Sequence, residues 1–344
     1  MTITLAGMAR EELAALLTQR YGEPAFRAKQ VFEWIYQGAE PGEMSNLPKT
    51  LRQRLSEDAT SAGLCLVEAL TEEKSATKKY LMRTKDDIII ECVLLRYAHG
   101  NTICVSSQAG CRMHCKFCVS GKEGLFRNLT AGEMLSQLIL AERDTGEKIR
   151  NVVMMGSGEP LDNYEECVKF IRLAGDPKGF GIGIRHFTLS TCGIIPGIIR
   201  LIEDGLHVNL AVSLHSPIGK IREEMMPVER AYPIREVVGA CREYRERTGR
   251  RVTFEYCLVE GLNDTQDCAD ALAELVGTGD FHINLINVNQ GSGAYGKNSA
   301  NRIDAFAEQL RRRNLNCTVR RKLGSSINAA CGQLKSRYET QSRE

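Results

Sequence analysis

The chain has no long apolar segment. None of the apolar runs in its 344 residues approaches the length of about 18 residues that a membrane-spanning helix needs. The first five residues lack the basic, apolar and cleavage regions of a secretory signal peptide. We therefore expect a cytoplasmic protein without a membrane partner.

The chain also lacks a strong charge imbalance, an internal repeat and a disulfide pattern. Its formal net charge is +2, with 43% hydrophobic and 26% charged residues, which is ordinary for a soluble globular protein. The cysteines number 13, an odd count without the spacing of a disulfide framework. We expect most of them to be reduced and packed as small apolar residues, including Cys167, Cys192, Cys241, Cys257 and Cys268.

From residue 102 onward, β-branched runs alternate with helical patterns. Strands are predicted at 102–107, 151–156, 186–190, 208–214, 252–258 and 282–287, and helices at 130–143, 163–174, 194–203, 234–247, 264–276 and 299–313. The helix at 130–143 starts with a capping box, Thr130-Ala131-Gly132-Glu133. Six such units and a last strand at 317–321 imply parallel strands with right-handed crossovers. Because six units are too few for a closed eight-stranded barrel, we expect an α/β fold with an open, partial (β/α)6 TIM-like barrel. A doubly wound sheet is the rival fold, and in both the active site lies at the carboxyl ends of the strands.

The first hundred residues have a different pattern. Residues 1–70 have a helical pattern, and the segment 25–37 has an apolar face that includes the single tryptophan, Trp34. Apolar runs at 79–83 and 88–97 flank the turn Asp86-Asp87 and predict a β-hairpin. We therefore divide the chain into an N-terminal helical accessory domain (1–75), a β-hairpin extension (76–101), a core with a C-terminal cysteine loop (102–334) and a polar tail (335–344).

A loop with three cysteines follows the first strand of the core. Cys111, Cys115 and Cys118 form a Cys-x₃-Cys-x₂-Cys pattern. Three thiolates on one loop can bind a [4Fe–4S] cluster and leave the fourth iron open to another ligand. The alternative is a zinc site closed by His114, which would have to fold back on its own loop to reach the metal.

Polar segments also follow other predicted strands, and five such strand ends would face one basin. The segment Gly156-Ser157-Gly158-Glu159 has two glycines that let a ligand approach the backbone, and a carboxylate that can accept hydrogen bonds from an ammonium group. A plain strand–helix turn is the alternative for this segment, and a structural cap is the alternative for His215. Together with the cysteine loop, these strand ends predict a bound small molecule.

Two further residues stand out, although each has an ordinary explanation. Glu91 is an acid inside an apolar strand, and it could simply face solvent on the polar side of that strand. Cys331 lies between Ala330 and Gly332, which leave its thiol sterically open, and a buried structural cysteine is the ordinary interpretation. Basic clusters at 311–313 and 320–322 are either a solvated surface or a contact for a polyanion.

Taken together, these motifs resemble the RlmN/Cfr family of radical S-adenosylmethionine (SAM) RNA methyltransferases. The resemblance rests on the three-cysteine loop, Gly158-Glu159-Pro160, Ser213-Leu214-His215 and Ala330-Cys331-Gly332-Gln333-Leu334, which occur in the family's order over nearly the whole chain. It implies that the three loop cysteines hold one [4Fe–4S] cluster whose open iron chelates SAM. The residues that match the family's SAM contacts are Gly158, Glu159, Ser190, Ser213, Leu214, His215 and Asn289.

The resemblance also implies a role for three other residues. Cys331 matches the cysteine that one SAM molecule methylates, while a second SAM yields the radical that takes a hydrogen from that methyl group. The carbon then adds to adenine, and Cys104 matches the cysteine that resolves the thioether through a disulfide with Cys331. Glu91 matches the base that removes the adenine proton.

The expected substrate is an adenosine of 23S rRNA in the peptidyl transferase centre, and a tRNA adenosine next to the anticodon. Methylation at C2, as in RlmN, is favoured because it is the commoner housekeeping activity, and Cfr-like C8 methylation with antibiotic resistance is the alternative. A non-catalytic, zinc-stabilised RNA-binding protein is a third possibility. We further expect a monomer that receives electrons from a flavodoxin or ferredoxin.

Overall fold

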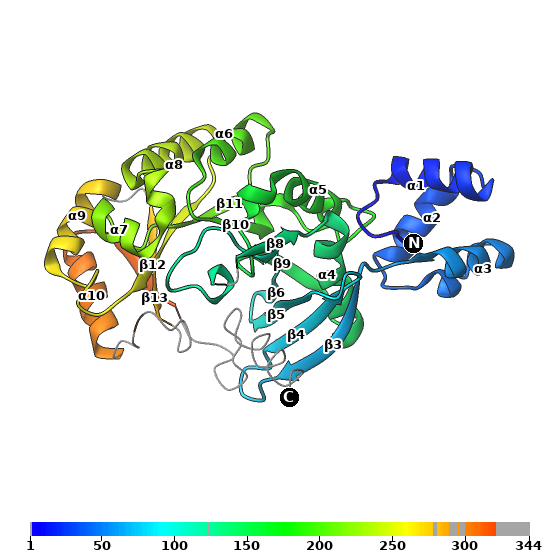
Figure 1. Cartoon of the computed structure of the whole chain (residues 1–344), viewed down its shortest axis with the longest axis horizontal. Helices are drawn as coiled ribbons and strands as arrows, with labels where there is room; N and C mark the ends of the chain where they lie inside the picture. The colour runs from blue at the N-terminus through cyan, green and yellow to red at the C-terminus, as the bar shows by residue number, and fades with distance from the viewer. Residues whose placement is uncertain (1, 123, 278–280, 289–294, 296–299, 321–344) are drawn as a thin grey trace.

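A computed structural model of the chain describes residues 2–122, 124–277, 281–288, 295 and 300–320. Its centre is a ten-stranded sheet with the order β14-β13-β12-β11-β10-β9-β6-β5-β4-β3 (Figure 1). From β6 to β14 every neighbouring pair is parallel, and from β6 to β3 every pair is antiparallel. The strands are β3 (Leu64–Thr71), β4 (Lys78–Thr84), β5 (Ile89–Tyr97), β6 (Gly100–Cys104), β9 (Ile149–Met154), β10 (Phe187–Thr191), β11 (Asn209–Ser213), β12 (Val252–Leu258), β13 (His282–Asn287) and β14 (Asn316–Val319).

The parallel strands follow one another in chain order, which decides between the two expected folds. A doubly wound sheet reverses its strand order, whereas a sequential order with right-handed crossovers places every helix on one face of the sheet. The partial-barrel prediction is therefore confirmed. The crossover helices are α4 (Ala131–Thr145), α5 (Tyr164–Gly175), α6 (Ile195–Glu203), α7 (Gly219–Met225), α8 (Ile234–Thr248), α9 (Gln266–Val276) and α10 (Ala300–Arg312).

The two faces of the sheet carry different side chains because neighbouring residues of a strand point to opposite sides. On the helix-covered face, apolar residues from all the central strands join one buried core, among them Ile103, Val152, Phe187, Leu210 and Phe254. The predicted packing of Cys167, Cys192, Cys241, Cys257 and Cys268 is confirmed, since all five are buried.

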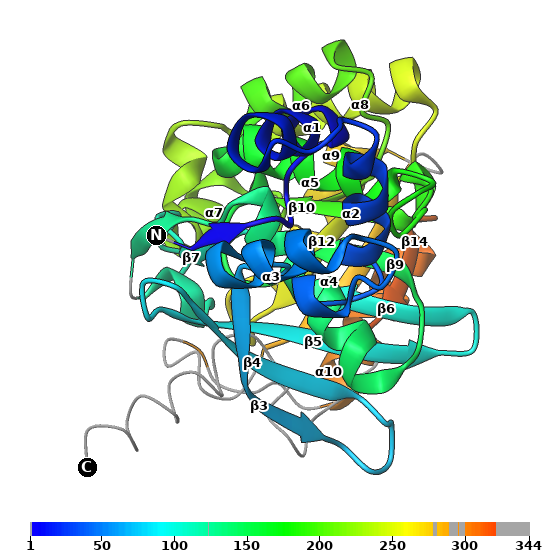
Figure 2. The ribbon, with the colours of Figure 1, turned by 90° about the vertical axis from the view of Figure 1, so that its right-hand side faces the viewer.

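The antiparallel part of the sheet contains the predicted hairpin of β4 and β5 and one strand more. Residues 1–70 were predicted to be helical, and this is wrong for β3, which forms the outer edge of the sheet (Figure 2). Short pairs were missed too, namely β1 (Ile3–Thr4) with β2 (Ala59–Thr60), and β7 (Gln108–Gly110) with β8 (Leu125–Asn128). Pairs this short carry almost no periodic signal, and the partners of β7 and β1 lie far along the chain.

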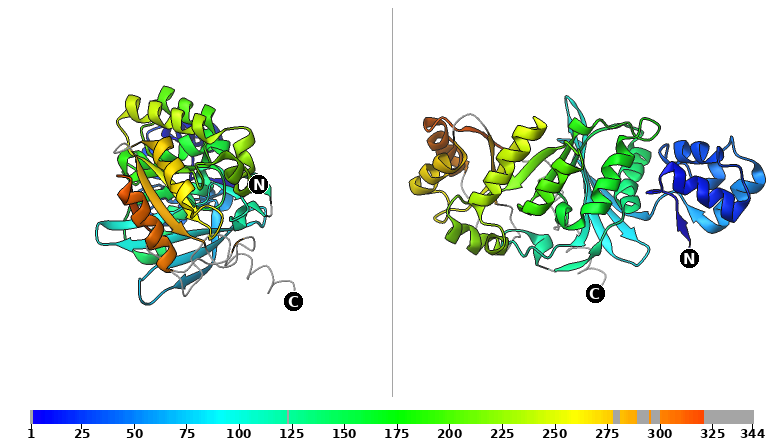
Figure 3. Two further views of the ribbon diagram at one scale, coloured as in Figure 1. Left: turned by 90° about the vertical axis from the view of Figure 1, so that its left-hand side faces the viewer. Right: turned by 90° about the horizontal axis from the view of Figure 1, so that it is seen from above.

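The helical part of the N-terminal region lies at one end of the molecule (Figures 1 and 3). Gly7 and Gly132 lie in close backbone contact, because a Cβ on Gly132 would meet the Ala6 carbonyl oxygen at 2.3 Å. Lys169 of α5 pairs with Glu12 at 2.9 Å. The region therefore packs on α4 and α5. Its helical elements are α1 (Arg10–Leu16), a π-helical turn (Leu17–Tyr21), α2 (Arg27–Ile35), a 3₁₀ turn (Pro41–Glu43) and α3 (Lys49–Asp58).

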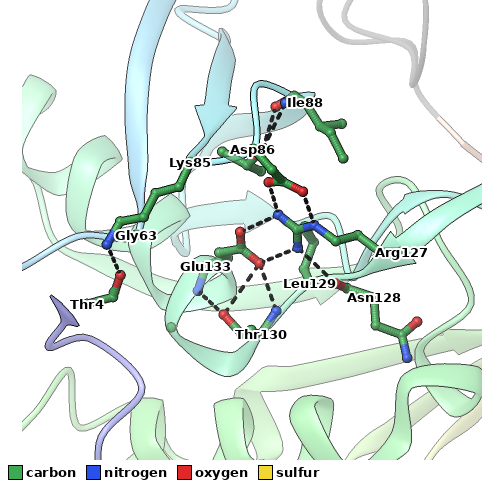
Figure 4. Close-up of polar contacts among 12 residues, drawn as sticks. Thr4, Gly63, Lys85, Asp86, Ile88, Arg127, Asn128, Leu129, Thr130 and Glu133 are labelled. Carbon is green, nitrogen blue, oxygen red and sulfur yellow. Dashed lines mark hydrogen bonds and ion pairs between the residues drawn. The ribbon is translucent and has the colours of Figure 1, made fainter. Parts of the chain in front are cut away.

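Helix α4 begins at the capping box that the sequence predicted. Thr130 accepts a hydrogen bond from the Glu133 N–H at 3.2 Å, and Glu133 accepts one from the Thr130 N–H at 2.9 Å. Arg127 of β8 donates to both carboxylate oxygens of Glu133 and of Asp86, as Figure 4 shows. One guanidinium thus joins the turn between β4 and β5, strand β8 and the start of α4.

Further turns complete the described chain. They are 3₁₀ helices at Val119–Gly121, Pro160–Asn163, Ile184–His186 and Pro227–Arg230. None of the helices within the described ranges is long and apolar enough to cross a membrane.

Candidate active site

The three-cysteine loop leaves the sheet at its carboxyl edge and is closed by the β7–β8 ladder. The Cys111 N–H donates to the Gly124 carbonyl at 2.8 Å, and the Lys116 N–H donates to Met225 at 2.9 Å. Arg112 binds Asp162 through two hydrogen bonds of 2.8 and 2.5 Å. The loop is therefore anchored at its start and in its middle by contacts with the protein.

His114 has a structural contact within this loop. Its φ is 51°, and its Nδ1 lies 3.0 Å from the Gly121 carbonyl oxygen. The ring thus joins the two ends of the short turn that contains Cys115 and Cys118. This contact occupies the nitrogen nearest the backbone and gives His114 a role other than that of a fourth zinc ligand.

The donor set of the loop fits an iron–sulfur cluster better than a single ion. Three sulfurs on one zinc ion lie about 3.8 Å apart, because each Zn–S bond is about 2.3 Å. In the described part of the chain, no group of three His, Cys, Asp or Glu side chains is gathered closely enough for one ion. A [4Fe–4S] cluster needs a wider set, since each sulfur binds a different iron. Cys111, Cys115 and Cys118 on one anchored loop match that requirement.

The surroundings of the loop are apolar and keep the thiols protonated in the metal-free protein. Burial, and then Cys118, Glu159 and Asp162, raise the pKa of Cys111 to about 12. Burial and the other two loop cysteines also raise the pKa of Cys115. Apolar side chains at the ends of β10, β12 and β13 and at the end of α7 form one buried cluster with the loop, including Cys192, Val288 and Met225. A cationic metal group would reverse this balance by stabilising the thiolates.

Glu91 and Cys104 lie on the face of the sheet away from the helices. Val93 pairs with Cys104, and Cys104 pairs with Val153, so these three side chains share one face. Glu91 is two residues from Val93 and therefore points to the same side. Its carboxylate is 8% exposed and lies 3.3 Å from the fully buried Lys79 ammonium, so the alternative that Glu91 faces solvent is wrong.

Ser190 and Ser213 lie on this same inner face. Thr188 pairs with Val153, which puts Ser190, two residues on, beside Ala211, and Ser213 is two residues further along β11. Ser213 in turn pairs with Glu255. The register thus brings Glu91, Cys104, Ser190 and Ser213 to one concave surface at the carboxyl half of the sheet.

The glycines after β9 have a packing role that the sequence did not reveal. A Cβ on Gly156 would meet the Val105 carbonyl oxygen at 2.6 Å, and one on Gly158 would meet the Gln108 Cβ at 2.6 Å. Ser157 accepts hydrogen bonds from the N–H groups of Ser107 and Gln108 at 2.9 and 3.1 Å. The glycines are thus needed to pack two strand ends together, and the close approach of a ligand to them stays a prediction.

Glu159 uses its carboxylate to fix the end of β10. One oxygen accepts from the Cys192 N–H at 2.7 Å and the other from the Leu161 N–H at 3.1 Å. Burial raises the pKa of Glu159, while these hydrogen bonds act in the opposite direction. The residue is 4% exposed, and it lies close enough to raise the pKa of Cys111 and Cys115.

His215 is buried and neutral. Its Nδ1 accepts a hydrogen bond from the Cys257 N–H at 2.8 Å, which leaves Nε2 as the ring's donor. Burial, with a contribution from the Arg222 charge, lowers the pKa of His215 to about 3. The ring also contacts Phe117 of the cysteine loop edge-on, with 4.5 Å between the ring centroids. The structural role of His215 is therefore observed at Nδ1, and its contact with SAM stays a prediction.

Two buried residues that hold the strand ends were not found from the sequence. Arg222 donates to the carbonyls of Cys192, Ser213 and Leu214. Asn263 donates to the carbonyls of His215 and Cys257 at 2.6 and 2.8 Å. Arg222 reaches Cys192 and Asn263 reaches His215, 30 and 48 residues away along the chain, so no local motif marks these contacts.

A polar cavity of about 300 Å³ lies deeper on the inner face. It contains the buried Glu255, which accepts a hydrogen bond from Asn284 at 2.8 Å and whose pKa is raised by burial.

Two predicted site residues, Asn289 and Cys331, lie outside the residues that the structure describes, so the Cys104–Cys331 pairing stays a prediction.

Two family models match the chain. The model described as the radical SAM superfamily matches residues 105–275. The model described as the ribosomal RNA large subunit methyltransferase N-terminal domain matches residues 3–60. The first range contains the cysteine loop and the strand ends described above, and the second contains the helices at the N-terminal end.

Full-length relatives and one solved structure are also similar. A protein of Symbiobacterium thermophilum named "Probable dual-specificity RNA methyltransferase RlmN" is 48% identical over 97% of this chain and 92% of its own length. A Clostridium acetobutylicum protein of the same name is 45% identical over 92% of each. The crystal structure of a radical SAM methyltransferase from Sphaerobacter thermophilus is 42% identical, covers 96% of this chain and 98% of its own, and superposes with a TM-score of 0.91.

Proposed function

Because the chain belongs to the RlmN family of radical SAM RNA methyltransferases, we propose that it methylates C2 of an adenosine in 23S rRNA and in tRNA. The observation that carries this proposal is the position of the anchored three-cysteine loop beside the inner face with Glu91 and Cys104. The substrates follow from the dual specificity in the relatives' names and from the resemblance of the motifs.

The cofactors of this proposal are one [4Fe–4S] cluster and SAM. Cys111, Cys115 and Cys118 would hold the cluster, and two SAM molecules would be used in each turnover. The cluster, when bound with SAM, supplies the one-electron chemistry that C2 of adenine requires, since this ring carbon is not nucleophilic enough for direct methyl transfer. A flavodoxin or ferredoxin would supply the electron.

Glu91 would act as the base that takes the proton from the adenine ring. It is 8% exposed, and its carboxylate lies 3.3 Å from the Lys79 ammonium. Because the partner is a buried ion on a neighbouring strand, the carboxylate is also held in place. We expect Glu91→Gln to bind RNA but to lose turnover.

Cys104 would resolve the covalent adduct between Cys331 and RNA. In this step, the Cys104 thiolate would attack the Cys331 sulfur and the carbon–sulfur bond to RNA would break. The carbon would keep the electron pair of that bond and take up a proton to become the methyl group, and a disulfide would remain for the reductant to open. Cys104 is 8% exposed and lies on the same face as Glu91. We therefore expect the Cys104→Ala variant to accumulate protein linked to RNA.

Anaerobic reaction with an rRNA fragment and SAM tests this function, with chromatography of the digested nucleosides against 2-methyl- and 8-methyladenosine standards. The proposal predicts 2-methyladenosine from the wild type and a protein–RNA adduct from Cys104→Ala. Cys65→Ala, at an exposed cysteine of the edge strand, is the matched control and should react like the wild type.

Three outcomes would contradict the proposal. 8-Methyladenosine would assign the chain to the Cfr-like activity. One zinc per chain, no iron and no product would support the non-catalytic RNA-binding protein. Turnover by Cys104→Ala at the wild-type rate would remove the assigned role of Cys104.

A further inference from the structure

A buried arginine joins three backbone carbonyls at the carboxyl edge of the sheet. Arg222, in the short helix α7, is fully buried, and its guanidinium donates to Cys192 at 2.7 Å, to Ser213 at 3.1 Å and to Leu214 at 3.1 Å. Cys192 directly follows β10, and Ser213 is the last residue of β11. The ends of two neighbouring strands are thus held by one side chain.

The guanidinium is fixed from its other side by Glu229. This carboxylate pairs with Arg222 and also accepts two hydrogen bonds from the Ile234 N–H, at 3.0 and 3.2 Å, at the start of α8. A carboxylate near a helix N-terminus is favoured by the helix dipole. The pair therefore connects the strand ends to the rigid helix that covers them.

The turn that Arg222 holds has an unusual backbone. His215 has a φ of 54°, a region that residues other than glycine seldom adopt. The N–H groups of Leu214 and His215 both donate to the Glu255 carbonyl, at 3.0 and 3.2 Å, and Arg222 donates to the carbonyls of Ser213 and Leu214. The turn is therefore fixed from two sides, which determines where the Ser213 hydroxyl and the His215 ring lie.

A lysine at position 222 could not make all the hydrogen bonds that Arg222 makes. The guanidinium is a planar fork with five N–H donors, and four of its partners lie in fixed directions around it. An ammonium has three donors on one atom and would leave at least one carbonyl without a donor. A buried acceptor without a partner costs about 1–3 kcal/mol, so the strand ends would rearrange.

We propose that Arg222 is a positioning residue for SAM binding, which fixes the ends of β10 and β11 so that Ser190, Ser213 and His215 meet the methyl donor. The inference rests on the proposed function, which places SAM at these strand ends. Arg222 itself touches no ligand in this account, because its described donors are directed at backbone carbonyls and Glu229.

The experiment compares three variants, each reconstituted with its cluster under anaerobic conditions. Arg222→Lys (R222K) tests the fork, and Glu229→Gln (E229Q) removes the ion pair but keeps an acceptor for Arg222. Arg242→Lys is the matched control, because Arg242 also donates to two backbone carbonyls, of Leu275 and Val276 at 3.0 Å each, but at the end of α9. That helix end lies at the opposite edge of the barrel from the strand ends.

The readouts are iron content, the denaturant midpoint of unfolding, the SAM dissociation constant by equilibrium dialysis, and the change that SAM causes in the electron paramagnetic resonance spectrum of the reduced cluster. The proposal predicts normal iron and about a tenfold weaker SAM affinity for R222K, with an altered SAM-dependent spectrum. It predicts a smaller loss of SAM affinity, about threefold, for E229Q, because glutamine keeps an acceptor for Arg222 but removes the ion pair that fixes it. The Arg242→Lys variant should bind SAM like the wild type.

Equal SAM affinity and an unchanged spectrum in R222K would overturn the proposal. So would a loss of SAM affinity in R222K and E229Q that simply follows their loss of stability. Should R222K not fold, E229Q decides alone, and a SAM affinity and spectrum equal to those of the wild type overturn the proposal. Wild-type protein that carries its iron but binds no SAM would instead overturn the proposed function, and this inference with it.

Discussion

At the scale of single residues, His215 makes the stability of the folded protein depend on pH. Its native pKa of about 3 lies below the ordinary value of 6.5, so the unfolded chain takes up a proton as the pH falls through 6.5 while the native ring stays neutral. This contribution to stability is therefore complete above about pH 6.5 and is lost as the pH falls toward 3.

We expect the metal-free protein to lose about 1.4 kcal/mol of unfolding free energy per pH unit below about pH 6 from this ring. His215→Asn should have a shallower slope, because asparagine tolerates a positive φ and can still accept from the Cys257 N–H. Denaturant titrations of both proteins between about pH 5 and 7 measure the difference. Equal slopes would show that His215 is protonated in the native state.

Gly158 gives a second test at this scale. It has a φ of 111°, and a Cβ there would lie 2.7 Å from the Gln108 nitrogen. We therefore expect Gly158→Ala to destabilise the protein by about 2 kcal/mol or more in denaturant unfolding. Gly239→Ala in helix α8 is the control, since nothing lies within 4 Å of its Cβ, and it should stabilise by about 0.5–1 kcal/mol. A neutral Gly158→Ala would refute the close packing described here.

Gly158, Glu159 and Arg222 show which features of the site could not be predicted from the sequence. A motif predicts Gly158 and Glu159 as site residues, but their observed contacts could not be predicted. Gln108 and Cys192, which lie about 50 and 30 residues away along the chain, decide what the glycine and the carboxylate do. Arg222 was not identified from the sequence because a charged residue on a short helix is ordinarily exposed.

At the scale of elements, Arg127 ties the β4–β5 turn to α4. Its guanidinium binds Asp86 and Glu133 together, and no other contact in Figure 4 joins these two acids. We expect Arg127→Met to lower the unfolding free energy by about 1–2 kcal/mol, since two acids lose a charged partner. Hydrogen exchange should become faster at residues 84–88 and 128–134.

Arg230→Met is the matched control for this prediction. Arg230 has a side chain that is 76% exposed and pairs with Glu223 at 2.5 Å. An exposed pair of this kind contributes little, so the change should be within about 0.5 kcal/mol. Unaltered exchange at residues 84–88 in Arg127→Met would contradict the link between the turn and the helix.

The strands and helices of the barrel were predictable because each has a strong period and a clear boundary. The strands β12 and β13 match the predicted ranges, and α4 begins at the predicted capping box. Strand β3 was not predictable in the same way. Cys65 and Leu66 are exposed on it, Glu68 interrupts its apolar residues, and its register shifts between Leu66 and Glu68. Pairing with β4 outweighs this weak local signal.

At the scale of the whole molecule, the N-terminal helices and the barrel meet at a contact that only glycine allows. Gly132→Ala would place a methyl group 2.3 Å from the Ala6 carbonyl oxygen, so the N-terminal segment must move away from α4. We expect faster proteolysis within residues 1–60 and a lower unfolding midpoint, with the cysteine loop still able to load iron. Gly146→Ala, at a site with nothing within 4 Å of the Cβ, separates this effect from general destabilisation. An unchanged cleavage pattern in Gly132→Ala would contradict the contact.

The central claim is that methyl transfer proceeds through a radical at the inner face of the barrel and a cysteine carrier. Reaction of an rRNA fragment with SAM that carries three deuterium atoms in its methyl group, followed by mass spectrometry of the methylated adenosine, tests it most directly. Hydrogen abstraction from the carried methyl removes one deuterium, so the account predicts a product with two. A product that keeps all three would mean direct polar transfer and would contradict the account.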